Sequence, residues 1–82
     1  MPKLKQLSGK EVVKIFELYG FKIKRNVGSH TRLTLFQDGI SYHITIPLHN
    51  SLKKGTLHSI VKDFELCFGK KETNKCFFNE RL

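Results

Sequence analysis

Histidine side chains are the groups in this sequence best suited to acid–base chemistry, because the imidazole has the unperturbed pKa that lies nearest neutrality. There are four histidines in 82 residues. His30 is the strongest candidate, since it follows a Gly28-Ser29 pair that separates two runs of alternating apolar residues, as in a β-hairpin. Such a turn would hold the imidazole at the edge of a sheet, among the basic residues Lys22, Lys24, Arg25 and Arg32.

The net charge narrows the class of partner. Fifteen Lys and Arg residues against seven Asp and Glu residues give a formal charge of +8 and a pI near 9.8. A positive field of this size concentrates polyanions, so we expect nucleic acid or an acidic protein as the partner. The alternative is a charge that only keeps the chain soluble. We find no basic amphipathic helix with an unburied apolar face, which a membrane surface would need.

The other three histidines are weaker candidates. His49 lies in a basic loop, where it can act as a second acid or base or hold the loop by hydrogen bonding. His43 shares a strand face with His30 by parity and is interpreted as a nucleic-acid contact or a neutral strand residue. His58 has no assigned role. No pair of these histidines has compact ligand spacing beside an acidic residue, so we expect no metal and no cofactor.

Hydropathy and cysteine usage favour a cytoplasmic protein. No stretch approaches the ~20 apolar residues of a membrane span, and no apolar run follows the charged first residues, as it would in a secretory signal. Cys67 and Cys76 match no zinc pattern, and a disulfide framework normally uses more cysteines. We expect two thiols in a reducing compartment, with a disulfide as the alternative.

Helical patterns flank a region of strands. Ser8 and Glu11 form a capping box ahead of an apolar stripe that ends at Gly20. A second stripe begins after Lys53-Lys54-Gly55-Thr56, with Thr56 as the expected N-cap. The backbone N–H groups at this helix start, with the lysines, predict a phosphate site, and an ordinary helix start is an equal alternative.

Between the helices, apolar and polar residues alternate in three segments separated by the turns Gly28-Ser29 and Asp38-Gly39. Parity predicts one apolar face, formed by Phe21, Ile23, Val27, Leu33, Leu35, Tyr42, Ile44, Ile46 and Leu48. The other face is cationic and polar and carries Lys22, Lys24, Asn26, His30, Arg32, Thr34, His43 and Thr45. Arg25 breaks the alternation, which we interpret as twisting or fraying of the first strand.

The order of a helix, three strands and a helix predicts an α+β protein, a two-layer α-β-β-β-α sandwich with both helices on one face of a three-stranded antiparallel sheet. We expect one domain over residues 1–82, with a core over 7–68. The residues from 69 to 82 are an extension that forms a short helix or an added strand. This order and the basic surface resemble the double-stranded RNA-binding domain.

A narrower resemblance rests on local motifs. Gly28-Ser29-His30, then Ile46-Pro47-Leu48-His49, then Lys54-Gly55-Thr56-Leu57 ahead of an apolar helix are similar, in this order and spacing, to the HicA family. Members of that family are small mRNA-cleaving toxins of type II toxin–antitoxin modules. The resemblance runs from Leu7 to about Phe64. It implies a metal-independent endoribonuclease, neutralised by a HicB-type antitoxin, with His30 as the catalytic residue.

The chemistry of RNA cleavage agrees with the choice of His30. Cleavage without a metal needs a base for the 2′-OH, an acid for the leaving 5′-oxygen and cations near the phosphorane. Our hypothesis is 2′-OH attack that gives a 2′,3′-cyclic phosphate, with His30 as the base or the acid. The expected RNA- and phosphate-binding residues are Lys22, Lys24, Arg25, Gly28, Ser29, Arg32, His43, Lys53, Lys54, Gly55 and Thr56. The alternative function is a non-catalytic RNA-binding module that reads duplex shape.

Overall fold

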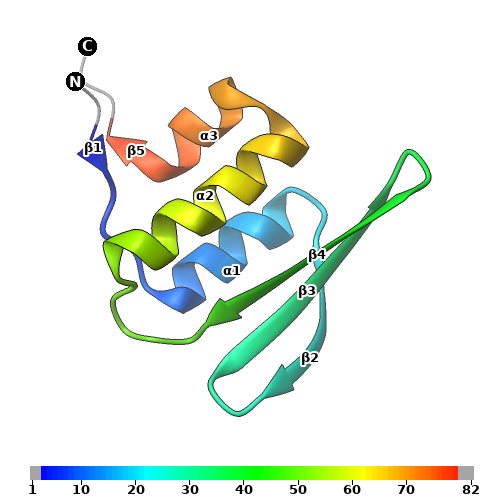
Figure 1. Cartoon of the computed structure of the whole chain (residues 1–82), viewed down its shortest axis with the longest axis horizontal. Coiled ribbons are helices and arrows are strands. Elements are labelled where there is room, and N and C mark those ends of the chain that lie inside the picture. Colours follow the sequence, from blue (N-terminus) through cyan, green and yellow to red (C-terminus); the bar gives the residue numbers. More distant parts are fainter. Residues whose placement is uncertain (1–2, 80–82) are drawn as a thin grey trace. The chain divides into compact units, whose positions relative to one another are not determined.

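The order of the elements confirms the predicted α+β class. The computed structural model describes residues 3–79, and its sheet is three-stranded and antiparallel, in the order β2-β3-β4. A helix precedes this sheet and further helices follow it, as in the arrangement predicted from the sequence (Figure 1). The elements are β1 (Lys3–Leu4), α1 (Gly9–Leu18), β2 (Lys22–Val27), β3 (His30–Gln37), β4 (Ile40–Pro47), α2 (Lys54–Phe68), α3 (Lys70–Phe77) and β5 (Phe78–Asn79).

The chain divides into two compact units. One unit, Leu7–Leu52, holds α1 and the three-stranded sheet, and the other joins residues 3–6 to residues 53–79 among those described. The expected single domain with a core over residues 7–68 stays a prediction. The last residues of the expected extension, 80–82, lie outside the described residues. No helix within residues 3–79 is long and apolar enough to cross a membrane.

The first helix begins and ends as its sequence predicts. Ser8 is the N-cap: its Oγ accepts the Glu11 N–H at 3.1 Å, and Glu11 Oε1 accepts the Ser8 N–H at 2.9 Å, which completes the capping box. Gly20 follows with a φ of +104°, a conformation that glycine adopts without strain. Val12 and Phe16 on this helix are buried, and α1 contacts β2 and β4.

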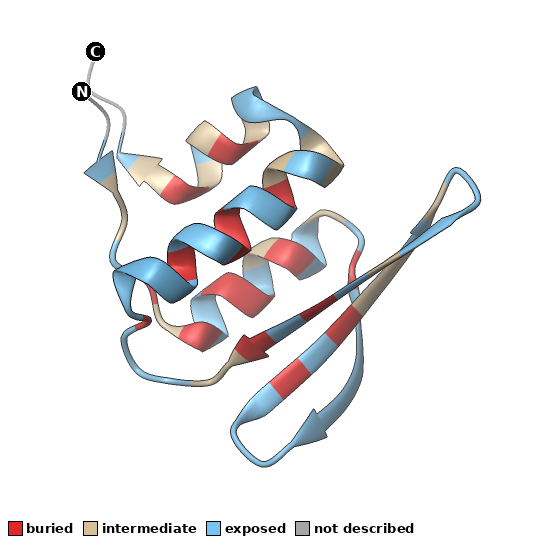
Figure 2. Ribbon diagram, in the orientation of Figure 1, coloured by how far each residue is buried: buried red, intermediate tan, exposed pale blue. Residues whose placement is uncertain are grey.

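The β3–β4 hairpin follows the predicted alternation. Asp38 and Gly39 at its tip both have positive φ, as a type I′ turn requires. Leu33, Ile44 and Ile46 are buried, and exposed residues lie between them (Figure 2). The apolar face that parity predicts for these two strands is therefore present.

The predicted parity of β2 is wrong beyond Ile23. The register shifts between Ile23, which pairs with Leu33, and Arg25, which pairs with Arg32, so that Lys24 is an extra residue in a β-bulge. Because residues that pair directly share a face, the bulge brings Val27 to the cationic face, opposite His30.

Asn26 moves to the opposite face for the same reason. It pairs with the buried Thr31, and the Thr31 hydroxyl donates to Asn26 Oδ1 at 2.7 Å. The predicted places of Val27 and Asn26 are thus exchanged. The cause is the extra residue that Arg25 signalled by breaking the alternation, and not fraying of the strand.

In the second unit, α2 begins earlier than predicted. Its N-cap is Lys53 and not Thr56, because the chain is already helical at Lys54 and the Leu57 N–H donates to the Lys53 carbonyl at 2.9 Å. Thr56 therefore lies within the first turn of α2.

The segment after Gly69 forms both of the structures that the sequence left open. Helix α3 comes first, and β5 then pairs with β1 in antiparallel fashion, with Leu4 opposite Phe78. Phe77 is fully buried, and its ring meets that of Phe64 edge to face at 5.0 Å. The segment from Lys70 to Asn79 is thus part of the packed second unit.

Candidate functional site

Three cross-strand rows of side chains lie on the open face of the sheet where all three strands pair. The register places three residues in each row, one from each strand, and the rows alternate with the buried ones. We call these nine residues the basic face. The rows are Val27, His30 and Pro47; Arg25, Arg32 and Thr45; and Lys22, Thr34 and His43.

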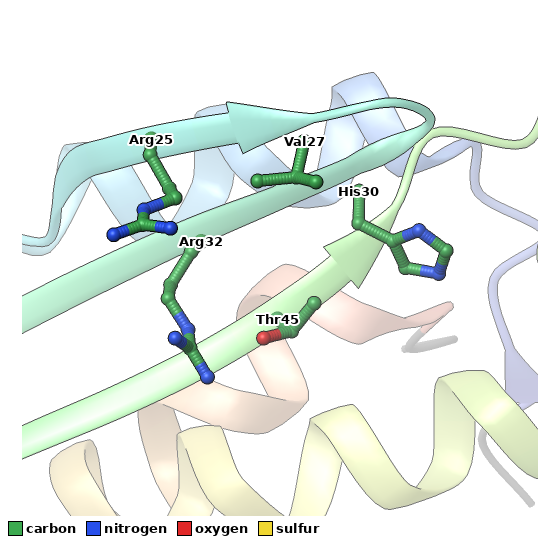
Figure 3. A pocket seen from close by; sticks show the side chains of 5 residues that line it. All are labelled: Arg25, Val27, His30, Arg32 and Thr45. Atoms are coloured by element: carbon green, nitrogen blue, oxygen red, sulfur yellow. The ribbon is translucent and has the colours of Figure 1, made fainter.

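A pocket of about 170 Å³, open to solvent, lies on the basic face. Its lining comes from all three strands and consists of Arg25, Val27, His30, Arg32 and Thr45. In Figure 3 the side chains of Arg25 and Arg32 lie next to each other on neighbouring strands, whereas the His30 ring lies at the turn end of the sheet. The pocket therefore combines one imidazole with two guanidinium groups.

The charge of this pocket is uniformly positive. Arg25 and Arg32 pair directly across β2 and β3, and His30 lies one row away. Among the residues that the structure describes, those lining the pocket include no carboxylate. Such a site favours an anion of two or more oxygens, because a guanidinium binds phosphate or carboxylate through paired N–H groups.

The turn that carries His30 is held by the loop after β4. Gly28 has a φ of +58°, and the Ser29 carbonyl accepts the Leu48 N–H at 2.6 Å. Ser29 does not have a positive φ, because Asp38 is the only non-glycine residue among residues 3–79 that does. A positive φ at the first central residue alone is the pattern of a type II′ turn. The backbone around His30 is thereby fixed on both sides of the turn.

The same loop is tied to the start of α1. The His49 carbonyl accepts the Gly9 N–H at 2.9 Å, and the Leu52 N–H donates to the Leu7 carbonyl at 2.9 Å. A Cβ at Gly9 would collide with the backbone of Pro47 and Leu48, so the helix approaches the loop at a distance that only glycine permits. The helix start, the loop and the turn thus form one connected support for the site.

The predicted site residues fall into separate places. Arg25, Arg32 and His30 meet in the pocket, while Lys22 and His43 lie one row further along the basic face. Gly28 and Ser29 form the turn, Lys24 is the bulge residue, and the exposed His49 lies in the loop. The residues at the start of α2, which belong to the other unit, are Lys53, Lys54, Gly55 and Thr56.

Two residues that line the pocket were not among the predicted site residues. Thr45 was placed on the cationic face by parity but given no role, and Val27 was assigned to the apolar face. The sequence did carry a signal for Val27, because Arg25 is a charged residue at a position where the alternation predicts an apolar one. A single extra residue ahead of Arg25 turns each following side chain, up to the turn, to the opposite face of the sheet.

Within residues 3–79, no group of three or more His, Cys, Asp or Glu side chains is placed to hold a metal ion. Neither Cys67 nor Cys76, in the other unit, forms a disulfide within the described residues. Burial, with a smaller contribution from the Asp63 carboxylate, raises the pKa of the Cys67 thiol, so this group remains protonated at neutral pH.

Comparison with known proteins gives one family. The family described as the HicA toxin of bacterial toxin–antitoxin systems matches residues 9–66. The searches of curated proteins and of solved structures found no match. The match spans α1, the sheet with its basic face, and most of α2. The chain therefore belongs to the HicA toxin family and is the toxin component of a toxin–antitoxin module, whose partner is an antitoxin.

Proposed function

We propose that this toxin is a metal-independent endoribonuclease that cleaves mRNA, with His30 as the catalytic acid or base. The observation that carries the proposal is the pocket in which His30 lies beside Arg25 and Arg32. Membership of the HicA family supports the same assignment, because the resemblance implies an RNA-cleaving toxin with this histidine.

The proposed reaction breaks one P–O bond and forms another at the same phosphorus. The 2′-oxygen of a ribose attacks the adjacent phosphate, and the base takes its proton. The 5′-oxygen of the next nucleotide leaves and receives a proton from the acid. The products are a 2′,3′-cyclic phosphate and a 5′-hydroxyl, and His30 performs one of the two proton transfers. The positive charge of the basic face offsets the extra negative charge of the phosphorane.

Replacing His30 tests the proposal directly. We expect His30→Ala to lower the rate of RNA cleavage by about 10²–10⁴-fold, the usual contribution of a positioned proton-transfer group, while RNA binding persists. Cleavage is measured on labelled RNA in the presence of EDTA, with analysis of both product ends. His58→Ala is the matched control, because His58 is an exposed histidine on α2.

The outcomes separate the candidate functions. Unchanged cleavage by His30→Ala, products with a 5′-phosphate, or loss of activity in EDTA would contradict the proposal. Wild-type protein that binds duplex RNA and cleaves nothing would instead support the non-catalytic binding module.

His49 is proposed as the second acid or base or as a residue that holds the loop. Its side chain is exposed, and its backbone carbonyl already accepts the Gly9 N–H. His49→Gln separates the two roles. A fall in the turnover number with an unchanged free energy of unfolding indicates proton transfer, and a fall in both indicates a structural role.

The start of α2 is proposed as a further phosphate contact. In the described chain no side chain caps this helix, so a phosphate can take the place of a capping group at its first turn, beside Lys53 and Lys54. We further propose that the antitoxin is a HicB-type protein and that the toxin acts in the cytoplasm. Copurification of the toxin with the product of an adjacent reading frame tests the first of these.

A further inference from the structure

Arg25 and Arg32 oppose each other directly across two strands of the basic face. Like charges in this position destabilise a sheet, and no carboxylate among the described residues lines the pocket to compensate them. A bound anion would relieve the repulsion. The pair is therefore better explained as part of a binding site than as part of the framework of the sheet.

The β-bulge creates this pair. If regular pairing continued from Ile23 and Leu33, Lys24 would lie opposite Arg32 and Asn26 would lie opposite His30. The extra residue instead brings in Arg25 and Val27. It exchanges an ammonium for a planar guanidinium, which binds phosphate through two N–H groups, and an amide for an apolar side chain.

The rows of the basic face have a spacing that suits one RNA strand. His30 and Arg32 are two residues apart on β3 and face the same way, which separates them by about 6.6 Å. This is comparable to the distance between consecutive phosphates of a single strand. Val27 pairs with His30 in the row nearest the turn, is 58% exposed and offers an apolar surface next to the arginine row.

We propose that Arg25 and Arg32 together bind one phosphate, the neighbour of the scissile phosphate, in single-stranded RNA. Val27 then contacts the ribose or base of the nucleotide at His30. The identity of the scissile phosphate rests on the proposed ribonuclease function. A single strand is favoured because its unpaired bases can reach an exposed apolar side chain, whereas a duplex turns its bases inward.

A neutral phosphate analogue tests the shared contact. The probe is a short single-stranded RNA with a 2′-O-methyl group at the attacked ribose, which blocks cleavage, and a methylphosphonate at one phosphate at a time. For the wild-type protein, we expect neutralising one of the two phosphates that flank the scissile one to weaken binding by at least about tenfold. The double variant Arg25→Gln/Arg32→Gln should show no such loss.

Salt dependence tests whether the two arginines bind the same phosphate. For single strands, the slope of log affinity against log salt becomes shallower by about 0.7 for each phosphate that the protein no longer neutralises. We expect this full change in the double variant, and a clearly smaller change in each single variant, because the remaining arginine still neutralises the phosphate. The control Lys10→Gln/Lys14→Gln removes the same charge from exposed positions on α1 and should keep the slope.

Val27 has its own matched control. Val27→Thr keeps the shape of the side chain and should weaken binding several-fold. Ile23→Thr makes a similar change to a partly exposed apolar residue of the same strand, on the opposite face, and should leave binding unchanged. Equal losses of affinity in the two variants would remove Val27 from the proposed contact.

Several results would overturn the shared contact. These are equal binding to a matched RNA duplex, no response to either flanking methylphosphonate, a slope that is shallower by about 0.7 in each single variant, or no binding of the probe. Failure of the ribonuclease proposal looks different. In that case natural RNA stays intact with wild-type protein, while the methylphosphonate response and its absence in the double variant remain.

Discussion

Arg25 and Arg32 of the basic face lower the stability of the folded chain, although we propose that they strengthen RNA binding. Because Arg25 and Arg32 repel each other across the strands, we expect Arg25→Gln or Arg32→Gln to raise the free energy of unfolding by a few tenths of a kcal/mol. Both side chains are exposed, so screening keeps the effect small and makes it decrease with added salt. Urea denaturation at low and high salt measures it.

The matched control for this prediction is Lys14→Gln, which removes one positive charge from α1. If that variant gains as much stability as the arginine variants, the gain comes from the lower net charge of the whole chain. A loss of stability in Arg25→Gln would mean that its side chain supports the fold, contrary to our interpretation.

At the scale of single residues, sequence parity succeeded wherever the strands are regular. His30 and Arg32 were placed correctly because no irregularity separates them on β3. Val27 and Asn26 were placed on the wrong faces. The prediction assigns side chains alternately to the two faces along the chain, and one extra residue exchanges the faces of all the residues after it. The position of a bulge depends on the partner strand, which the local sequence does not specify.

Among the elements, the capping box of α1 gives a pH-dependent contribution to stability. Hydrogen bonds from the Ser8 backbone and side chain hold the pKa of Glu11 below its ordinary value of 4.5. A carboxylate with a lowered pKa in the folded state contributes stability above its unfolded pKa, and the contribution is lost as pH falls through the folded pKa. The difference in unfolding free energy between wild type and Glu11→Gln should therefore shrink from pH 7 to pH 3.

Two variants sharpen the capping prediction. Ser8→Ala removes the acceptor for the Glu11 N–H and should cost about 1 kcal/mol at pH 7. Glu17→Gln removes a carboxylate from the same helix outside the capping box, and its difference from wild type should not follow the pH dependence of Glu11→Gln. If it does, the acid sensitivity belongs to the net charge and not to the cap.

Elements with side-chain signals were the ones that the sequence located well. The capping box of α1 and the Asp38-Gly39 turn both depend on side chains or on positive φ, and both were predicted. The start of α2 was missed because Lys53 precedes it without a capping side chain. The supporting contact of Gly9 with the loop after β4 was also invisible, since it depends on a close approach between distant segments.

For the molecule as a whole, the second unit depends on residues beyond the family match. The match ends at residue 66, yet Phe77 is fully buried and its ring meets Phe64, which also packs against Phe68 at 4.8 Å. We expect Phe77→Ala to lower the free energy of unfolding by about 3–5 kcal/mol, because it leaves a cavity in an aromatic cluster. Chemical denaturation measures the loss.

The exposed Leu66 provides the control for Phe77. Its side chain is 81% exposed, so Leu66→Ala should change the free energy of unfolding by no more than about 0.5 kcal/mol. Comparable losses of stability in both variants would contradict the assignment of Phe77 to the core of this unit.

The division of the chain into two units was outside the reach of the sequence. Hydrophobic periodicity and capping motifs are local signals in short windows of sequence, and they were sufficient to predict the helices and the sheet. The pairing of β1 with β5 joins the two ends of the described chain through strands of two residues each, which are too short to show alternation. Only the fold brings such segments together.

The β-bulge also determines which single-codon deletions this toxin can tolerate. Deleting Lys24 leaves Ile23 opposite Leu33 and Arg25 opposite Arg32, so both halves of β2 keep their partners and their faces. Deleting Asn26 restores even pairing only by turning Arg25 toward the buried Thr31. The first variant should fold and bind RNA, and the second should unfold at lower urea. Deletion of one residue is thus tolerated at the bulge residue itself and disrupts the strand when the deleted residue is a paired one after the bulge.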